Sequence, residues 1–335
     1  MIMDSSEIQQ ELFKQIKRNI PENLSATEEI ARILDVSPDS VYRRMRGEKT
    51  ISLDEVQRLC AHYKISLDQL IGLETNAFIF EGNLLSSKTF NFEAWVTSIM
   101  QQMAYMNSFK KKEFYYICKD IPFFHHYYFK EIAAFKWFFW LKTYFHFPEF
   151  EKRKFKFSDY PDELFALEQK VLNIYNQMPS TEFWNIESMN IILRQIAFYL
   201  DGDVFESSGD AYVLYELVGK IWDHLERQAT LGYKFDYNDP DKKPMGEFKM
   251  YFNEVLLGDN NILVILDDVK ASYITHTTIN YMITRDVRFN ENMYNHIQNT
   301  MKRSTLISKV SEKERSRFFR IVRDRLDRRK EALRG

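Results

Sequence analysis

The stretch "ILDVSPDSVYRRMRGEKTISLDEV", residues 33–56, decides how the N-terminal part of this chain folds. Ser37 followed by Pro38 is typical of a helix start, because serine caps the first backbone N–H groups and proline has none to leave unpaired. Before them stands Asp35, and aspartate is one of the few non-glycine residues that tolerate a left-handed backbone. Three arginines follow, Arg43, Arg44 and Arg46. The stretch therefore predicts two helices joined by a tight turn, with cations on the second.

Serine-led helix starts recur on both sides of this stretch. The serines with Glu or Gln three residues later, the spacing of a capping box, are Ser25 with Glu28, Ser52 with Glu55 and Ser66 with Gln69. Ahead of them, "EIQQELFKQIKRNI" (residues 7–20) places an apolar residue at every fourth position, which indicates an amphipathic helix. Residues 1–74 are therefore expected to form a compact domain of five short helices.

The apolar positions of residues 26–49 separate an inner from an outer face. Ile30, Ala31 and Leu34 are expected to face inward, Val36 to close the turn, and Val41 and Met45 to anchor the next helix. A recognition helix needs the opposite face free to reach base edges in the major groove. The candidate DNA-binding residues on or beside that face are Ser37, Asp39, Ser40, Tyr42, Arg43, Arg46 and Lys49.

Residues 25–72 resemble the lambda-repressor/Cro-like helix-turn-helix of the XRE family. The order "EEIARILDVS" (28–37) and then "DSVYRRMRGEKTISLDEVQRLCAHYKISLDQLIG" (39–72) follows that family's pattern. The resemblance implies that Thr27 contacts a phosphate and that Asp39 and Arg43 reach base edges. Arginine can grip the O6 and N7 atoms of guanine, and aspartate can accept from N4 of cytosine. Arg46 and Lys49 are expected to contact phosphates, which fix register without reading sequence.

Three positions depart from the family's pattern. Pro38 stands where a base-reading glutamine is common, so one direct contact is missing. Asp35 replaces the usual turn glycine, which its backbone tolerance allows. Arg44 occupies a position often held by a partly buried aromatic residue, and it could contact solvent, a phosphate or an acidic partner.

The overall charge does not by itself indicate a nucleic-acid partner. The 335-residue chain has a net charge of −2, and residues 1–75 hold 10 Lys and Arg against 13 Asp and Glu. Residues 302–334 hold 13 against 5, a local excess of +8. Binding by the first domain is therefore expected to come from a local cationic patch and from two copies acting together.

The rest of the chain is expected to be mainly helical. Residues 75–91 lose periodicity and read as a linker, and from 92 to about 230 apolar residues recur every three or four positions. Helical hairpins stacked on one another follow from that pattern. Only residues 261–276, "NILVILDDVKASYITH", read as a β-hairpin, which needs helices, another strand or a dimer partner to be stable.

The last 25 residues form a predicted basic helix with a Ser311–Glu314 capping box. Phe318, Val322 and Leu326 make an apolar stripe along it. Three interpretations stay open: a solvated helix, additional phosphate contacts, or a dimer interface.

No pattern of residues indicates a metal, cofactor or catalytic site. Cys60 and Cys118 lie within apolar patterns, and His125, His126 and His146 lack a ligand pair at a convincing spacing. The acidic pairs Asp201/Asp203 and Asp267/Asp268 fall where turns are expected. There is no Gly-rich phosphate loop or nucleophile elbow. We therefore expect that the protein is not an enzyme.

The most apolar segment, residues 129–147, carries four charges and is not expected to span a membrane, and the N-terminus lacks the pattern of a signal peptide.

We predict a cytoplasmic, mainly α-helical transcriptional regulator with a helix-turn-helix domain at 1–74 and a helical sensor or dimerisation domain at 92–335. Its predicted partners are double-stranded DNA with a palindromic operator, a second copy of the chain, and a small-molecule or peptide effector. The alternative is a protein-interaction or peptide-sensing module whose helix-turn-helix does not bind DNA.

Overall fold

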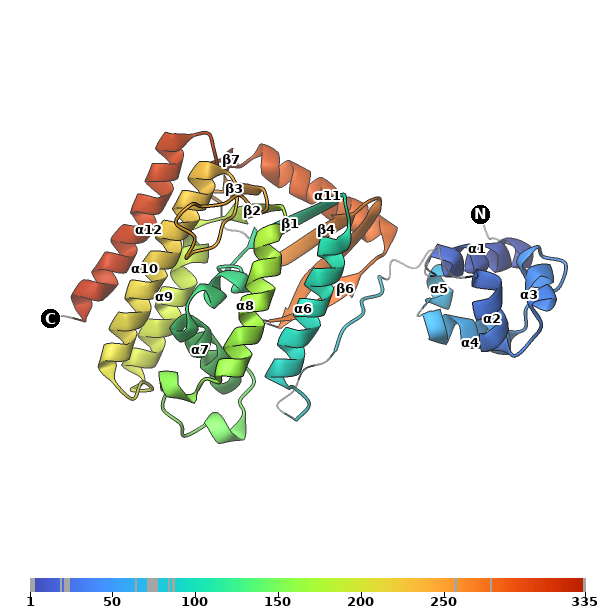
Figure 1. Cartoon of the computed structure of the whole chain (residues 1–335), viewed down its shortest axis with the longest axis horizontal. Helices are drawn as coiled ribbons and strands as arrows, with labels where there is room; N and C mark the ends of the chain where they lie inside the picture. The colour runs from blue at the N-terminus through green and yellow to red at the C-terminus, as the bar shows by residue number, and fades with distance from the viewer. Residues whose placement is uncertain are drawn as a thin grey trace. The chain divides into compact units, whose positions relative to one another are not determined.

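A computed structural model divides the chain into two compact units, residues 1–79 and 80–335 (Figure 1). The residues that the structure describes are 4–18, 20, 25–63, 65–70, 78–83, 85, 88–255, 258–277 and 279–333.

In the part of the first unit that the structure describes, five helices surround a small apolar core. They are α1 (Ser5–Arg18), α2 (Ala26–Leu34), α3 (Pro38–Met45), α4 (Leu53–Tyr63) and α5 (Leu67–Leu70). The core takes Leu12 and Ile16 from α1, Ile30 from α2, Val41 from α3 and Leu59 from α4, all at most 1% exposed. The five short helices and the inward direction of Ile30 and Val41 are as the caps and apolar spacing predicted.

The second unit is built on a seven-stranded mixed sheet with the order β6-β5-β4-β1-β2-β3-β7. The strands are β1 (Lys112–Cys118), β2 (Ser180–Trp184), β3 (Phe248–Phe252), β4 (Asn261–Leu266), β5 (Val269–Thr277), β6 (Asn280–Thr284) and β7 (Thr305–Leu306). The three strands β1, β2 and β3 run parallel, and every other pairing is antiparallel. The connections between the parallel strands are helical, as parallel pairing requires.

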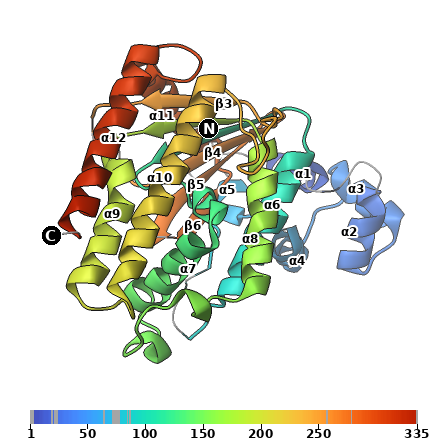
Figure 2. The same cartoon turned by 60° about the vertical axis from the view of Figure 1, so that its left-hand side comes forward.

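Helices cover one face of this sheet in a thick layer, and among the described elements α11 (Val287–Lys302) covers part of the other (Figures 1 and 2). The thick layer contains α6 (Phe92–Ser108), α7 (Lys130–Phe139), α8 (Asp162–Gln177), α9 (Ile186–Asp201), α10 (Ser208–Leu231) and α12 (Glu312–Ala332), with 3-10 turns at Phe123–Tyr128, Pro148–Phe150 and Phe157–Asp159 and a π-helical turn at Trp140–Tyr144. The opposite face packs on α11 (Val287–Lys302). Alternate residues of β1 serve the two sides, since Tyr116 joins the large core and Ile117 joins Ile297 of α11.

The expectation of stacked helical hairpins with one small β-hairpin is wrong. Residues 261–276 do form two paired strands, but β4 also pairs with β1 and β5 with β6, so they are the middle of a large sheet. The strands β1 and β2 were missed because central strands are buried on both faces and show no alternation. The helical pattern expected from residue 92 to about 230 is also interrupted at Ser180–Trp184, which form β2, and α9 begins only at Ile186.

The C-terminal helix α12 packs within the second unit. Phe318, Val322 and Leu326 are at most 3% exposed and belong to the same core as α9 and α10. Several of its cations are paired with acids of other elements: Arg317 with Glu254, Arg323 with Asp223 and Glu226, Arg325 with Glu187, and Lys330 with Glu216. The predicted capping box is absent, because Ser311 adopts a left-handed backbone (φ 54°) and its side chain caps no N–H. Its apolar stripe is therefore core, which leaves it unavailable for a dimer interface.

None of the helices in the described ranges is long and apolar enough to cross a membrane.

Candidate nucleic-acid interface

The turn between α2 and α3 fixes how α3 is presented. Ser25 caps α2 by accepting from the backbone N–H of Glu28, and α2 ends at Asp35 in the left-handed conformation (φ 55°, ψ 52°). Ser37 then caps α3 by accepting from the backbone N–H of Ser40 at 3.3 Å, with Pro38 in the first turn. Both features that the sequence placed at this turn are confirmed, and they make α3 a separate, capped helix.

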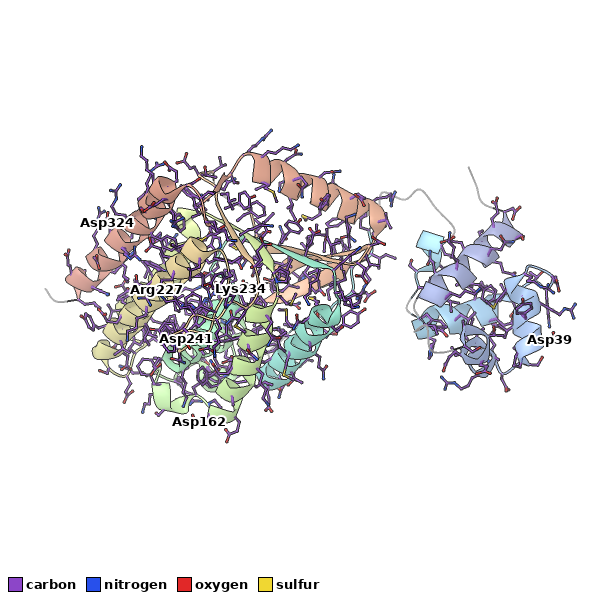
Figure 3. The ribbon with its side chains drawn as sticks, turned by 45° about the horizontal axis from the view of Figure 1, so that its top comes forward. Asp39, Asp162, Arg227, Lys234, Asp241 and Asp324 are labelled. Atoms are coloured by element: carbon purple, nitrogen blue, oxygen red, sulfur yellow. The ribbon has the colours of Figure 1, made fainter. Side chains whose placement is uncertain are left out.

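The outer face of α3 carries a cluster of long polar side chains. Asp39 lies at the outer side of the unit (Figure 3), and Tyr42 is 52% exposed. The Arg46 guanidinium lies over the Tyr42 ring, 5.0 Å from its centroid. Arg43 and Arg46 each expose more than half of their side chains. This face can offer hydrogen-bond donors, a carboxylate and an aromatic ring to a ligand in front of it.

Glu48 holds the two arginines of this face together. Its carboxylate lies 2.8 Å from Nη2 of Arg46 and 3.9 Å from Nε of Arg43. Exposed pairs of this kind are weak, on the order of 0–1 kcal/mol. An anion with a denser charge, such as a phosphate, can therefore displace Glu48 at little cost.

The next arginine, Arg44, points the other way. Only 5% of its side chain is exposed, and its guanidinium binds Glu55 of α4 with Nε at 3.1 Å and Nη2 at 2.6 Å. It also donates to the backbone oxygen of Ser40 at 3.1 Å and to the Ser40 hydroxyl. The sequence left three contacts open for Arg44: solvent, a phosphate or an acidic partner. The structure shows the acidic partner. The pair ties α3 to α4.

The Glu55 carboxylate also closes the capping box at the start of α4. It accepts from the backbone N–H of Ser52 at 2.9 Å, and the Ser52 hydroxyl accepts from the N–H of Glu55 at 3.2 Å. Burial alone would raise the pKa of Glu55, but the hydrogen bonds from Arg44 and Ser52 hold this pKa below its usual range. Glu55 is therefore charged at neutral pH and stabilises both elements.

The buried side chain of Gln9 in α1 holds the backbone that follows α3, a role that the sequence did not indicate. Its amide Nε2 donates to the backbone oxygens of Arg44 (2.7 Å) and Lys49 (2.8 Å), and its Oε1 accepts from the N–H of Ile51 at 2.9 Å. The backbone that carries Arg46 and Lys49 is thus fixed at both ends. The only signal in the sequence is an amide between the apolar positions Ile8 and Leu12, which is too common to be decisive.

The remaining predicted residues are placed as follows. Thr27 is half-buried in the first turn of α2, with its hydroxyl 4.0 Å from the Met45 sulfur, and Ser40 is half-buried beside Arg44. Ser37 is exposed but its hydroxyl serves as the cap, and Lys49 is exposed just beyond α3. The structure thus brings Asp39, Tyr42, Arg43 and Arg46 to one face, while Ser37 and Ser40 have structural partners.

One group of buried polar side chains in the second unit surrounds Glu182 of β2. Glu182 accepts from the Ser180 hydroxyl at 2.9 Å and from the Trp184 Nε1 at 3.1 Å, besides the Tyr175 hydroxyl. Nearby, burial lowers the pKa of Lys234 to about 7, and its ammonium donates to the Tyr175 backbone oxygen at 2.9 Å. These groups hold the sheet to the helices.

The other polar residues considered in the sequence lie at turns or in the core. Asp203 and Asp267 both adopt left-handed backbones at turns (φ 51°), as turn formers do. Burial raises the pKa of the Cys118 thiol and lowers that of His126, so both are neutral core groups at pH 7. No group of three or more His, Cys, Asp or Glu side chains in the described part of the chain is arranged to hold a metal ion.

Comparison with known families gives one match, which covers the first unit and extends into the first residues of the second. Residues 4–87 match the BetR domain, a helix-turn-helix type of DNA-binding domain. The chain matches no curated protein and no solved structure. The match supports a helix-turn-helix DNA-binding unit at the N-terminus and does not single out the XRE family that the sequence resembles.

Proposed function

We propose that this protein is a sequence-specific transcriptional regulator that reads DNA with α3 of its first unit. The observation that carries the proposal is that α3 has one exposed polar face and one buried face that packs on the neighbouring helices. Asp39, Tyr42 and Arg43 are exposed, while Arg44 and Val41 are buried and fix the helix on its neighbours. A recognition helix needs this combination, because base contacts require long side chains on a rigid support.

Within this proposal each exposed side chain has a distinct role. Arg43 donates to the O6 and N7 atoms of a guanine, and Asp39 accepts from a cytosine amino group. Arg46 leaves Glu48 for a phosphate, and Lys49 binds a phosphate from the anchored loop. Thr27 contacts a phosphate from the start of α2. Only the first two contacts distinguish one base pair from another.

We also propose that the protein binds as a homodimer to a palindromic site. One α3 covers a single half-site, and two copies related by a two-fold axis place two recognition helices about one turn of DNA apart. The first unit has more acidic than basic residues, so a single copy binds weakly and the second copy supplies the missing affinity.

The second unit, in this proposal, regulates the first through binding a small-molecule or peptide effector and has no catalytic role. The buried Glu182 carboxylate accepts hydrogen bonds from Ser180, Trp184 and Tyr175, which favours a structural role for this one group.

The alternative is a helix-turn-helix that contacts a protein in place of DNA. Pro38, which removes one usual base contact, and the acidic balance of residues 1–75 favour this alternative. The two proposals differ in their response to salt, because only DNA binding releases condensed counterions from a duplex.

The test is selection of duplexes from a random library with the full-length protein, followed by a salt titration of the best sequence. We expect the affinity to fall steeply with salt, and the double variant Arg43→Ala, Arg46→Ala to lose at least tenfold. The double variant Lys14→Ala, Arg58→Ala removes the same charge from exposed positions of α1 and α4 and should bind nearly as well as the wild type. Absence of any salt-sensitive preference in the wild type would overturn the proposal.

A further inference from the structure

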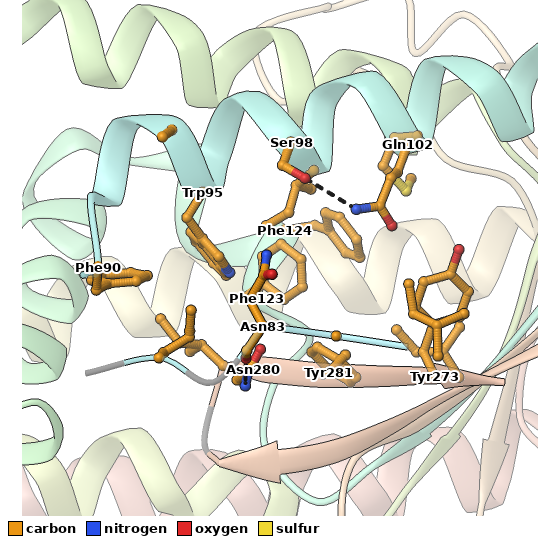
Figure 4. A pocket seen from close by; sticks show the side chains of 18 of the residues that line it. Asn83, Phe90, Trp95, Ser98, Gln102, Phe123, Phe124, Tyr273, Asn280 and Tyr281 are labelled. Atoms are coloured by element: carbon orange, nitrogen blue, oxygen red, sulfur yellow. Dashed lines mark hydrogen bonds between the residues drawn. The ribbon is translucent and has the colours of Figure 1, made fainter. Parts of the chain in front are cut away.

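The second unit contains an open cavity of about 560 Å³ between α6 and the outer strands of the sheet (Figure 4). Its walls come from α6, from residues 82, 83, 85 and 89–91, from the 3-10 turn at Phe123–Tyr128, and from β1, β4, β5 and β6. A volume of this size lies within the range of small-molecule sites, roughly 300–1,000 Å³. We propose that this cavity binds a neutral, mostly apolar small molecule with a flat ring system, and that its occupation regulates the first unit.

The lining selects against charge. None of the described residues that line the cavity is Asp, Glu, Lys, Arg or His. The apolar wall is rich in rings and thioethers, with Phe90, Trp95, Phe124 and Met103 among its members. Transfer of an isolated charge to such surroundings is costly, whereas flat apolar ligands stack well on aromatic side chains. The site therefore fits an uncharged molecule with aromatic or similarly flat character.

A few polar groups converge at one end of the cavity. Gln102 and Ser98 of α6 are hydrogen-bonded, with Nε2 of Gln102 donating at 3.2 Å, and the Tyr273 hydroxyl of β5 points toward the same end (Figure 4). Burial raises the pKa of Tyr273 to about 12, so its hydroxyl stays protonated at neutral pH. An amide and a hydroxyl at one end suit a single neutral polar group on the ligand, such as a carbonyl, hydroxyl or amide.

The room for a ligand comes from the sequence of α6. Ala94, Ser98 and Gln102 are four residues apart, so they form one stripe of the helix that faces the cavity. The first two are small and exposed, so they leave this side of the cavity open. The neighbouring stripe with Val96 and Met103 is buried in the usual way.

Gly82 and Asn83, which line the cavity, belong to the segment at the start of the second unit, next to the first unit along the chain. Just before Gly82, Glu81 exchanges two backbone hydrogen bonds with Ile283 of β6, at 2.7 and 2.8 Å. The Asn280 amide holds the backbone oxygen of Asn83 at 2.8 Å. Residues 82 and 83 line the cavity and also fall within the BetR match. A ligand that prefers one position of this segment therefore biases the chain that leads to the DNA-binding unit. This regulatory step rests on the proposed function.

The binding test uses the full-length protein and two probes with the same ring system. 1-Anilinonaphthalene is neutral, and its 8-sulfonate derivative carries one negative charge. Binding of each probe is measured by the change in the fluorescence of the probe when the probe itself is excited. We expect saturable binding of the neutral probe and at least tenfold weaker binding of the sulfonate. Equal affinity for both probes, or no saturable binding of the neutral one, would overturn the ligand assignment.

A matched pair of substitutions on α6 locates the site. Ala94→Trp places an indole in the mouth of the cavity, whereas Ala104→Trp makes the same change at an exposed position of α6 outside the lining. We expect the first to weaken the neutral probe at least tenfold and the second to leave it unchanged. Equal effects of the two would place the probe elsewhere.

The regulatory step has its own readout. A saturating concentration of the neutral probe should change the affinity for the selected duplex in the wild type and not in Ala94→Trp. Unchanged DNA affinity alongside confirmed probe binding would overturn the regulatory step alone. Failure to bind any duplex would overturn the proposed function. The probe titration would still test whether the cavity binds a neutral ligand.

Discussion

At the scale of single residues, Arg43 and Arg44 show how one helix divides support from recognition. They are adjacent in the sequence, yet Arg43 exposes 55% of its side chain and Arg44 exposes 5%. A helix turns about 100° per residue, so neighbours cannot share a face. The arginines in this sequence therefore carry different information: one is available to a ligand and the other holds α4.

This division predicts opposite effects of two equivalent substitutions. Arg44→Met leaves the partly buried Glu55 carboxylate without its partner and should destabilise the first unit by about 2–4 kcal/mol. Arg43→Met removes only exposed contacts and should change stability by less than about 0.5 kcal/mol. All five tryptophans lie at residues 95–222, so hydrogen exchange of the α3 and α4 amides is the suitable measurement.

The double variant Arg44→Met, Glu55→Leu serves as the control. It removes both charges, and much of the lost stability should return. Equal protection of the α3 amides in the two single variants would show that Arg44 does not hold the helix.

Glu168 predicts a specific pH dependence in the second unit. Burial raises the pKa of this α8 carboxyl to about 8, well above the roughly 4.3 of a free glutamate. The folded state then binds the proton more tightly than the unfolded state. The resulting stability is complete below about pH 4 and is lost as the pH rises through about 8.

We therefore expect Glu168→Gln to flatten this loss between about pH 5 and pH 8.5. Urea unfolding followed by tryptophan fluorescence at several pH values measures it, with exposed Glu163→Gln on the same helix as the control. An unchanged slope in Glu168→Gln would mean that Glu168 is ionised in the folded protein at neutral pH.

At the scale of elements, local signals predicted the first unit well and the second unit poorly. Ser37 and Pro38 start α3, and Asp35 ends α2, as the sequence indicated, because caps and turns depend on neighbouring residues. The strands β1, β2 and β3 are only 7, 5 and 5 residues long and sit in the middle of a sheet. Their pairing partners are distant in sequence. The strands β1 and β2 are buried almost throughout and show no alternation, and β3 alternates over only five residues.

The helix α12 is a second case in which the sequence predicted an element but not its packing partner. Its apolar stripe was visible in the sequence, but the sequence could not say what the stripe contacts. Phe318 lies against Phe252 of β3, with ring centroids 5.1 Å apart, and is fully buried. That contact joins residues 66 positions apart and exists only in the folded sheet.

Phe318→Ala is therefore expected to destabilise the second unit by about 3–5 kcal/mol, because the substitution leaves a cavity in the core. Arg320→Ala, at an exposed position of the same helix, should have little effect. Chemical unfolding followed by tryptophan fluorescence measures both. If Phe318→Ala changed the oligomeric state and left unfolding unaltered, the stripe would belong to an interface and not to the core.

At the scale of the whole molecule, the two units differ in how far their function follows from sequence. The recognition face comes from eleven consecutive residues, 39–49, so its chemistry could be predicted directly. The cavity of the second unit gathers side chains from positions 82 to 283, which only the fold brings together. Gln9, 35 positions before Arg44, was missed for the same reason.

The most direct test of the account measures which base pair Arg43 reads. Each base pair of the selected half-site is substituted in turn, and the affinities of the wild type and Arg43→Ala are compared. We predict that Arg43→Ala loses discrimination at one base pair per half-site, about 1–3 kcal/mol, and keeps it elsewhere. Lys49→Ala should instead weaken all sequences alike and reduce the salt dependence. If Arg43→Ala weakened every sequence equally, or none, Arg43 would not be reading a base, and the role assigned to it on α3 would be wrong.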